Sequence, residues 1–230
     1  MTDFSTEDII AQFRNHLSQK LFPCVAAQDA VSKDSIKCLV ADHMACPKDD
    51  HAIVTFMYDF IGEIKKAGTL FYSAVILFRQ PSIQSEDMFE SLFWQRLQAF
   101  ADIDAASYAY DSRVDPDPAS PHFSFSIGEE AFYIIGLHPV STRKARRFQY
   151  PAIVFNPHVQ FEKLREKNHY GKMQKVVRKR DESFSGTINP MLSDFGEASE
   201  VFQYSGRQYN QDWKCPLIIP HARTKHHTTT

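Results

Sequence analysis

The sequence predicts an α+β domain in which helices cover a mostly antiparallel or mixed sheet, with a mixed α/β arrangement as the alternative. Helical periodicity alternates with short apolar runs in the first hundred residues, and a hairpin-like pair of runs follows near residue 130. A chain of 230 residues buries on the order of 70% of its unfolded surface. We therefore expect one domain over residues 1–220 and a flexible polar tail at 221–230.

The first predicted helix begins at residues 5–8, because the serine hydroxyl and the acid three residues later form a capping pattern. Apolar side chains at Ile9, Phe13 and Leu17 then recur every fourth residue and mark one buried face. The residue before a proline avoids the helical region, so we expect Pro23 to end this helix.

The next elements are a short strand at 36–41, a helix at 52–66 with Gly68 as its cap, and an apolar run at 70–78. That run is almost continuous in apolar and aromatic residues, which is typical of a central strand buried on both faces. Ser85 then provides the N-cap of a further helix.

Three prolines make residues 111–121 a loop. Residues 123–137 read as two strands joined by a Gly-Glu-Glu turn, and 152–155 as another short buried strand. Residues 159–181 are helical in pattern, with an interruption near 168–171. The basic stretch at 162–180 is either a solvated face or a docking surface for a redox partner.

Composition excludes several classes of function. A net charge of −2 argues against nucleic-acid binding, and no apolar run approaches the roughly 20 residues of a membrane span. Four cysteines lack a Cys-x-x-Cys pair, which disfavours a zinc ribbon. The acidic, polar N-terminus does not resemble a signal peptide, so we expect a cytoplasmic protein.

Residues 136–161 hold the most suggestive chemistry. His138 and His158 each follow an apolar run, and a basic cluster that includes Arg143, Arg146 and Arg147 lies between them. Imidazole ligates metals and haem iron, whereas clustered arginines bind carboxylate or phosphate. The pattern suits haem, with its iron and propionates, or a phosphorylated ligand, and the spacing leaves both open.

Several longer motifs accompany these residues. They are Gly136-Leu137-His138-Pro139, Phe155-Asn156-Pro157-His158, Asn189-Pro190-Met191-Leu192, Asp194-Phe195-Gly196-Glu197, Gln203-Tyr204-Ser205-Gly206-Arg207, Trp213-x-Cys215-Pro216 and Phe22-Pro23-Cys24. Together they resemble the YqcI/YcgG family over roughly residues 20 to 217. Members with a known role are haem-dependent enzymes that hydroxylate guanidine or amine nitrogen of small amino-acid-like metabolites, one branch acting in guanitoxin biosynthesis. The resemblance implies haem b and dioxygen or peroxide.

Three side chains are candidate axial ligands of such a haem. His158 begins a helix, where a cationic imidazole is disfavoured; His138 is fixed beside Pro139; and Cys215 would give a thiolate. Each has a structural alternative, since a histidine at a strand end is often hydrogen-bonded in the core and a free cysteine packs as a small hydrophobe. Arg143, Arg146 and Arg147 are the propionate candidates.

A guanidine or amine substrate is cationic, so its pocket needs carboxylates or carbonyls. Glu197 and Glu200 would share a helix face if that stretch is helical, with Asp194 as its cap. The candidate catalytic residues are Glu197, Glu200, Asn189, Tyr204 and Arg207, with Arg207 for a substrate carboxylate; the alternative is a structural loop network.

Three functions therefore remain open. The first is a haem-dependent N-hydroxylase, the second a haem carrier or sensor without turnover, and the third a protein that binds a phosphate-bearing ligand through the arginine cluster. No Gly-x-Gly-x-x-Gly fingerprint is present to indicate a nicotinamide or flavin.

Overall fold

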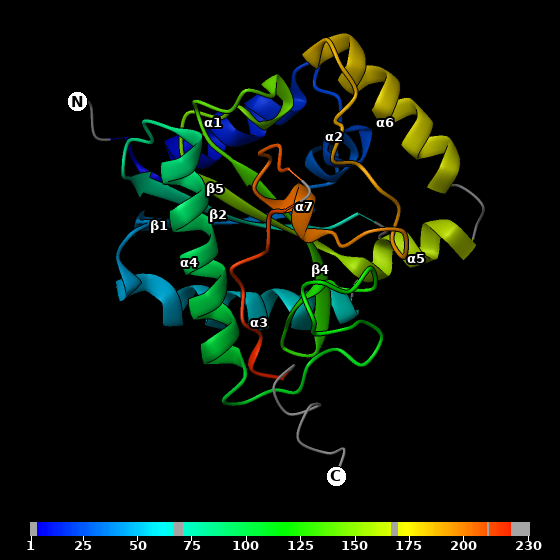
Figure 1. The fold of residues 1–230 in the computed structure, drawn as a ribbon. Helices are drawn as coiled ribbons and strands as arrows, with labels where there is room; N and C mark the ends of the chain where they lie inside the picture. Colours follow the sequence, from blue (N-terminus) through cyan, green and yellow to red (C-terminus); the bar gives the residue numbers. More distant parts are fainter. Residues whose placement is uncertain (1–3, 67–70, 167–169, 211, 222–230) are drawn as a thin grey trace.

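A computed structural model describes residues 4–66, 71–166, 170–210 and 212–221. Within this part of the chain, seven α-helices surround one open five-stranded sheet, which confirms the α+β prediction (Figure 1). The cap predicted at Gly68 and residues 222–230 of the predicted tail lie outside the described residues.

The sheet is mixed, with strand order β1-β2-β5-β4-β3. Its first two strands are parallel and are connected through a helix, whereas the other neighbours pair antiparallel. The strands are β1 (Ile36–His43), β2 (Ser73–Gln80), β3 (Phe125–Ile127), β4 (Glu130–Leu137) and β5 (Ala152–Pro157). The connecting helix is α3 (Asp50–Lys66).

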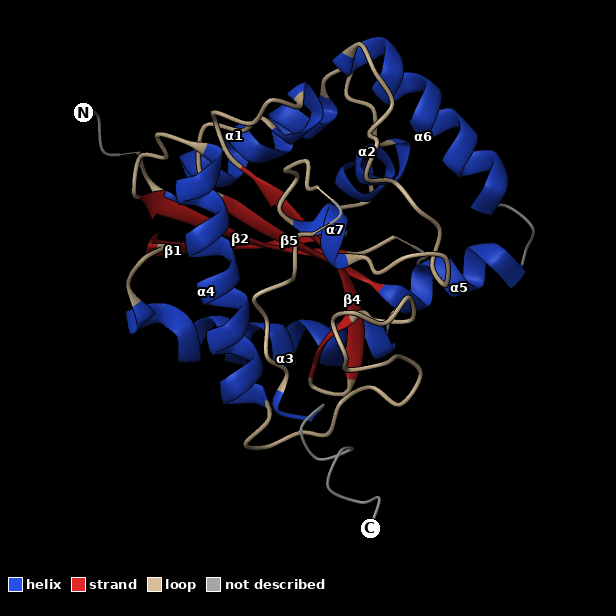
Figure 2. Cartoon of the chain, in the orientation of Figure 1, coloured by secondary structure: helices blue, strands red, loops and turns tan. Residues whose placement is uncertain are grey.

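Two apolar cores lie on the two faces of this sheet, because successive side chains of a strand point to opposite sides. On one face, Ile76, Ile134 and Phe155 pack in the larger core beneath α3 and α4 (Glu86–Asp104). On the other, α1 (Thr6–Ser18) and α2 (Val25–Ser32) contribute to a smaller core (Figure 2). β2 contributes to both, as its apolar run predicted.

The sequence located most of these elements. The capping box of α1 is present, with Ser5 and Asp8 each accepting the other's backbone N–H. The hairpin turns at Gly128 and Glu129, both with positive φ, as the tight turn between β3 and β4 requires. Helix α2 was not predicted, because Pro23 was read only as the end of a helix.

The C-terminal part contributes Val201, Tyr204, Leu217 and Ile219 to the larger core. Helix α5 (His158–Glu166) follows β5 directly, α6 (Tyr170–Ser185) lies beside α2, and the short α7 (Val201–Tyr204) packs against β4 (Figure 1). The predicted break between the first two falls largely on residues 167–169, outside the described residues.

Candidate functional site

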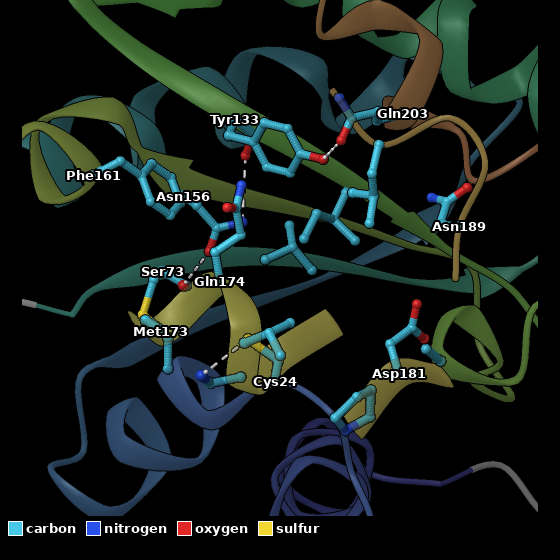
Figure 3. Close-up of a pocket in the computed structure, with 18 of the residues that line it drawn as sticks. Cys24, Ser73, Tyr133, Asn156, Phe161, Met173, Gln174, Asp181, Asn189 and Gln203 are labelled. Atoms are coloured by element: carbon cyan, nitrogen blue, oxygen red, sulfur yellow. Dashed lines mark hydrogen bonds between the residues drawn. The ribbon is translucent and has the colours of Figure 1, made fainter. Parts of the chain in front are cut away.

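A cavity of about 310 Å³ lies between the sheet and helices α1, α2, α5 and α6 (Figure 3). Val75, Val154 and Ile135 form its floor, and the strand register places these three side by side across β2, β5 and β4. Further apolar side chains form the walls: Phe13, Leu17, Phe22, Phe71, Leu137, Phe161 and Leu192. The volume falls within the roughly 300–1,000 Å³ range of small-molecule and cofactor sites.

Four arginines interrupt this apolar lining: Arg143, Arg146, Arg165 and Arg178. Only two acidic side chains join them, Asp181 and Glu200. Because arginine stays charged at all physiological pH values, the formal charge of the cavity is positive. The lining therefore suits a ligand with an apolar body and one or more anionic groups.

The two innermost arginines are held by the fold itself. Arg143 donates from Nη2 to Asp181 Oδ2 at 2.5 Å and to the carbonyl of Thr187 at 3.1 Å. Arg146 donates to the carbonyls of Gly136, Gln203 and Tyr204. These contacts fix both guanidinium groups at the cavity, so a bound anion would meet charges that are already in place.

A cysteine at the start of helix α2 also lines the cavity. Cys24 is the N-cap of α2, and its Sγ accepts from the backbone N–H of Ala27 at 3.4 Å. Burial raises the pKa of this thiol, while the N–H groups of Ala26 and Ala27 oppose that shift. Met173 of α6 also lines the cavity (Figure 3). Both sulfurs are soft ligands of the kind that bind iron or copper.

A polar strip crosses the apolar floor. Tyr133 donates its hydroxyl to Gln203 Oε1 at 2.7 Å, and Ser73 donates to Asn156 Oδ1 at 2.7 Å (Figure 3). All four residues line the cavity. The strip offers acceptor oxygens to a ligand lying over the sheet.

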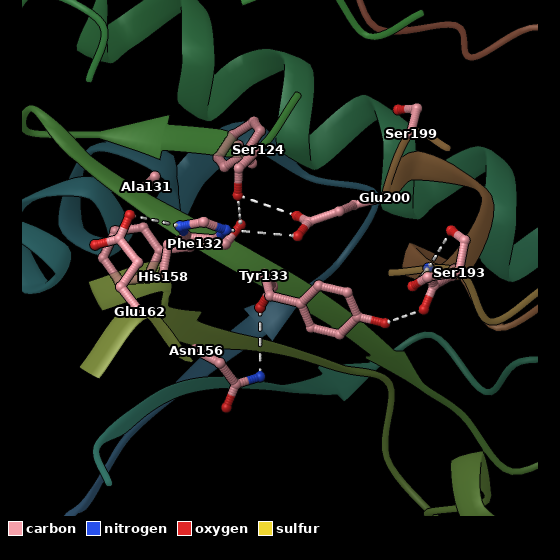
Figure 4. Close-up of polar contacts among 12 residues, drawn as sticks. Ser124, Ala131, Phe132, Tyr133, Asn156, His158, Glu162, Ser193, Ser199 and Glu200 are labelled. Carbon is pink, nitrogen blue, oxygen red and sulfur yellow. Dashed lines mark hydrogen bonds and ion pairs between the residues drawn. The ribbon is translucent and has the colours of Figure 1, made fainter. Parts of the chain in front are cut away.

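Beside this strip lies a buried carboxyl group. Ser124 and Tyr204 both donate to Glu200 Oε2, at 3.0 and 3.1 Å. Burial raises the pKa of Glu200 to about 7, against these two hydrogen bonds. His158 Nε2 lies 3.8 Å from Glu200 Oε1, and Nδ1 of the same ring lies 3.5 Å from Glu162 Oε1 (Figure 4). The imidazole therefore stands between two carboxylates.

The structure does not bring the predicted axial ligands to the cavity. His138 stacks on Phe89 of α4 at 4.2 Å, and so lies with the larger core on the other face of the sheet. Cys215 packs against that same core. His158 is buried but does not line the cavity. Cys24 was not among the predicted ligands. Its position directly after Phe22-Pro23, at the start of a helix, is the sequence signal that could have identified it.

Of the three arginines predicted to bind the propionates, two line the cavity and one does not. Arg143 and Arg146 line the cavity. Arg147 is exposed, and its Nε donates to the carbonyl of Ser141 at 2.6 Å. Two arginines that were not predicted, Arg165 and Arg178, come from the basic stretch at 162–180.

Of the predicted catalytic set, Glu200 and Asn189 line the cavity, and Tyr204 supports Glu200 from behind. Arg207 does not reach it, since it pairs with Glu90 of α4. Glu197 is exposed and accepts from the backbone N–H of Asp194.

The expected helix face shared by Glu197 and Glu200 is wrong. Gly196 has φ +93°, a turn conformation, and helix α7 begins only at Val201. Glu200 therefore points to the cavity while Glu197 faces solvent.

The chain is thus an α+β protein with an open mixed sheet and an apolar, arginine-lined cavity on one face of that sheet. The chain belongs to the YqcI/YcgG family, whose profile matches residues 13–218. It is 28% identical over 219 residues to the uncharacterized protein YqcI of Bacillus subtilis (strain 168), covering 89% of this chain and 85% of that protein. No solved structure matches the chain.

Two features are absent from the described residues. No helix there combines the length and the apolar character needed to cross a membrane. The same residues contain no group of three or more His, Cys, Asp and Glu side chains arranged to hold a metal ion.

Proposed function

We propose that the chain is a haem-dependent oxygenase that hydroxylates a guanidine or amine nitrogen of a small amino-acid-like metabolite. The observation that carries the proposal is the cavity itself, an apolar slot with four arginines and a cysteine sulfur in its walls. Membership of the YqcI/YcgG family is consistent with this activity through the resemblance described above.

The residues of the cavity fit haem b, although not through the histidines. A haem needs apolar walls for its ring, cations for its two propionates and one side chain that ligates iron. The walls are apolar, and Arg143 and Arg146 would hold the propionates. Cys24 would ligate the iron, in place of His138 and His158, because it lines the cavity and neither histidine does. When bound, the haem would supply the oxidising chemistry.

The other lining residues would bind and orient the substrate. A cationic guanidine or amine needs acceptors, and Glu200, Asn156 and Gln203 offer carboxylate and amide oxygens. The neighbouring apolar walls would exclude water from the reacting nitrogen, which strengthens these electrostatic contacts.

The ligand assignment is tested by the absorption spectrum of the purified protein, supplied with haemin if it is colourless. We expect wild type to give the spectrum of a thiolate-ligated haem, with a strongly red-shifted band for the ferrous carbon monoxide adduct. Cys24→Ser is expected to lose that band. Cys38→Ser is the matched control, since Cys38 lies on the same face of the sheet but does not line the cavity. An unchanged band in Cys24→Ser would refute the assignment.

An activity assay distinguishes a haem enzyme from a haem carrier. The loaded protein is incubated with arginine, other guanidines and amines, together with dioxygen and reductant or with peroxide, and products are sought by mass spectrometry as a gain of one oxygen. Haem binding without any product would favour a carrier or sensor. A protein that refuses haemin but is stabilised by a phosphorylated ligand in a thermal-shift screen would contradict the haem proposal altogether.

A further inference from the structure

We infer that Glu162, His158 and Glu200 form a proton relay that connects solvent with the cavity. The inference deepens the proposed function, because reduction of dioxygen at a buried site consumes protons. The relay itself depends only on the three side chains and is tested without a bound cofactor.

Exposure drops from the outer carboxylate to the two inner groups. The side chain of Glu162 is 35% exposed, that of His158 is 3% exposed, and that of Glu200 is 8% exposed. Glu162 thus meets water, whereas Glu200 lines the cavity. His158 lies between them, with one ring nitrogen directed at each carboxylate (Figure 4).

The imidazole of His158 is placed to pass a proton to Glu200. Its Nε2 is buried and has no hydrogen-bond partner, and an unpaired buried polar atom is costly. The nearest acceptor is Glu200 Oε1 at 3.8 Å, so a small rotation of either side chain would form the missing bond. The ring of Phe195 packs at 4.6 Å from the imidazole and shields it.

Burial disfavours the charged form of both inner groups. Burial lowers the pKa of His158 and raises that of Glu200 to about 7. Arg113, which lies 3.6 Å from Glu162 Oε2, and Arg165 oppose the imidazolium form, while Glu162 favours it. Other titratable groups that face the relay are Tyr110 and Tyr204, both with a raised pKa. Burial thus favours a proton on Glu200 over an imidazolium at His158.

One proton is delivered to the cavity in three transfers. Glu162 takes a proton from water and passes it to Nδ1 of His158, returning to its carboxylate form. The transient imidazolium gives its Nε2 proton to Oε1 of Glu200, which becomes a carboxylic acid at the cavity. Glu200 then protonates a group bound there. Rotation of the imidazole restores an N–H on the Glu200 side before the next delivery.

The test follows proton arrival at Glu200 after a light-triggered release of acid from a caged compound, starting near pH 8. Time-resolved infrared spectroscopy detects the carboxylic C=O band, which Glu200→Gln assigns by its loss. We expect His158→Gln and Glu162→Gln each to slow this protonation at least about tenfold, and Glu162→Asp to recover part of the rate.

Glu166→Gln is the control, because Glu166 is exposed on the same helix and outside the relay. It should stay within about twofold of wild type. If the His158→Gln variant does not fold, the protonation rate in Glu162→Gln still tests the relay, because Glu162 is partly exposed. Wild-type rates in the histidine and Glu162 variants would overturn the relay, since the proton would then enter through the cavity. Failure to bind haem would leave this result unaffected.

Discussion

A carboxyl group that is buried beside a cavity, as Glu200 is, differs from one that is buried for packing alone. Its two donors, Ser124 and Tyr204, both bind Oε2, which leaves Oε1 directed toward His158. A neutral acid at this position donates a hydrogen bond, and its carboxylate accepts one. The residue can therefore serve a cationic substrate in one state and deliver a proton in the other.

The raised pKa of Glu200 has a measurable consequence for stability. The unfolded chain releases this proton near pH 4.5, whereas the folded chain holds it to about 7. The contribution is therefore fully present below pH 4.5 and is lost as the pH rises through 7. At most about 3 kcal/mol disappears across this window. We expect urea unfolding between pH 5 and 8 to show this loss in wild type but not in Glu200→Gln.

The lowered pKa of His158 acts in the opposite direction in both proteins, so the comparison reports the change made by replacing Glu200. Parallel pH dependences of wild type and Glu200→Gln would show that Glu200 ionises normally.

A second prediction concerns Arg146, because its guanidinium donates to three backbone carbonyls in the buried interior. Arg146→Met keeps much of the volume but removes all three bonds, and we expect a loss of about 3 kcal/mol or more in the free energy of unfolding. Lys144→Met, exposed on the same short turn, should change it by less than about 0.5 kcal/mol. Equal effects in urea unfolding would contradict this role.

Among the elements, helix α4 packs closely against strand β4 at Gly136. A Cβ atom there would lie 2.8 Å from Phe89 Cε1 and 3.2 Å from Phe93 Cε2. Since both rings are fully buried, they have little room to move. The glycine thus sets the distance between the helix and the sheet on the face opposite the cavity.

We therefore expect Gly136→Ala to destabilise the fold by about 1–3 kcal/mol through overpacking. Gly62→Ala is the matched control: it lies within α3, nothing lies near its added Cβ, and alanine favours a helix by about 0.5–1 kcal/mol. Thermal unfolding should move in opposite directions for the two variants. A stabilised Gly136→Ala would show that the contact is looser than described.

The alternation of side chains along a strand explains which site residues could be located from the sequence. Tyr133, Ile135 and Leu137 face the cavity, so period two puts Gly136 and His138 on the other face. Counting along this strand would have removed His138 as a ligand. Such counting gives no position for Glu200, because it follows an irregular loop whose path depends on contacts with distant residues such as Ser124.

In the whole molecule, the interiors on the two faces of the sheet differ in kind. The side under α3 and α4 is a packed aromatic core, whereas the side under α1, α2 and α6 contains the cavity. Strands and most helices were predictable because their apolar periodicity is local. The cavity was not, since it forms where α2 and α6, 150 residues apart in numbering, cover one sheet face.

The most direct test of the central claim is an absorbance titration of the protein with haemin, in wild type and in Val154→Trp, whose indole would fill the cavity above the floor. We expect saturable one-to-one binding in wild type and weakening by about tenfold or more in the variant. Val40→Trp, on the same face but outside the cavity, should bind as wild type does. Absence of specific binding in wild type, or equal binding by Val154→Trp, would contradict the account.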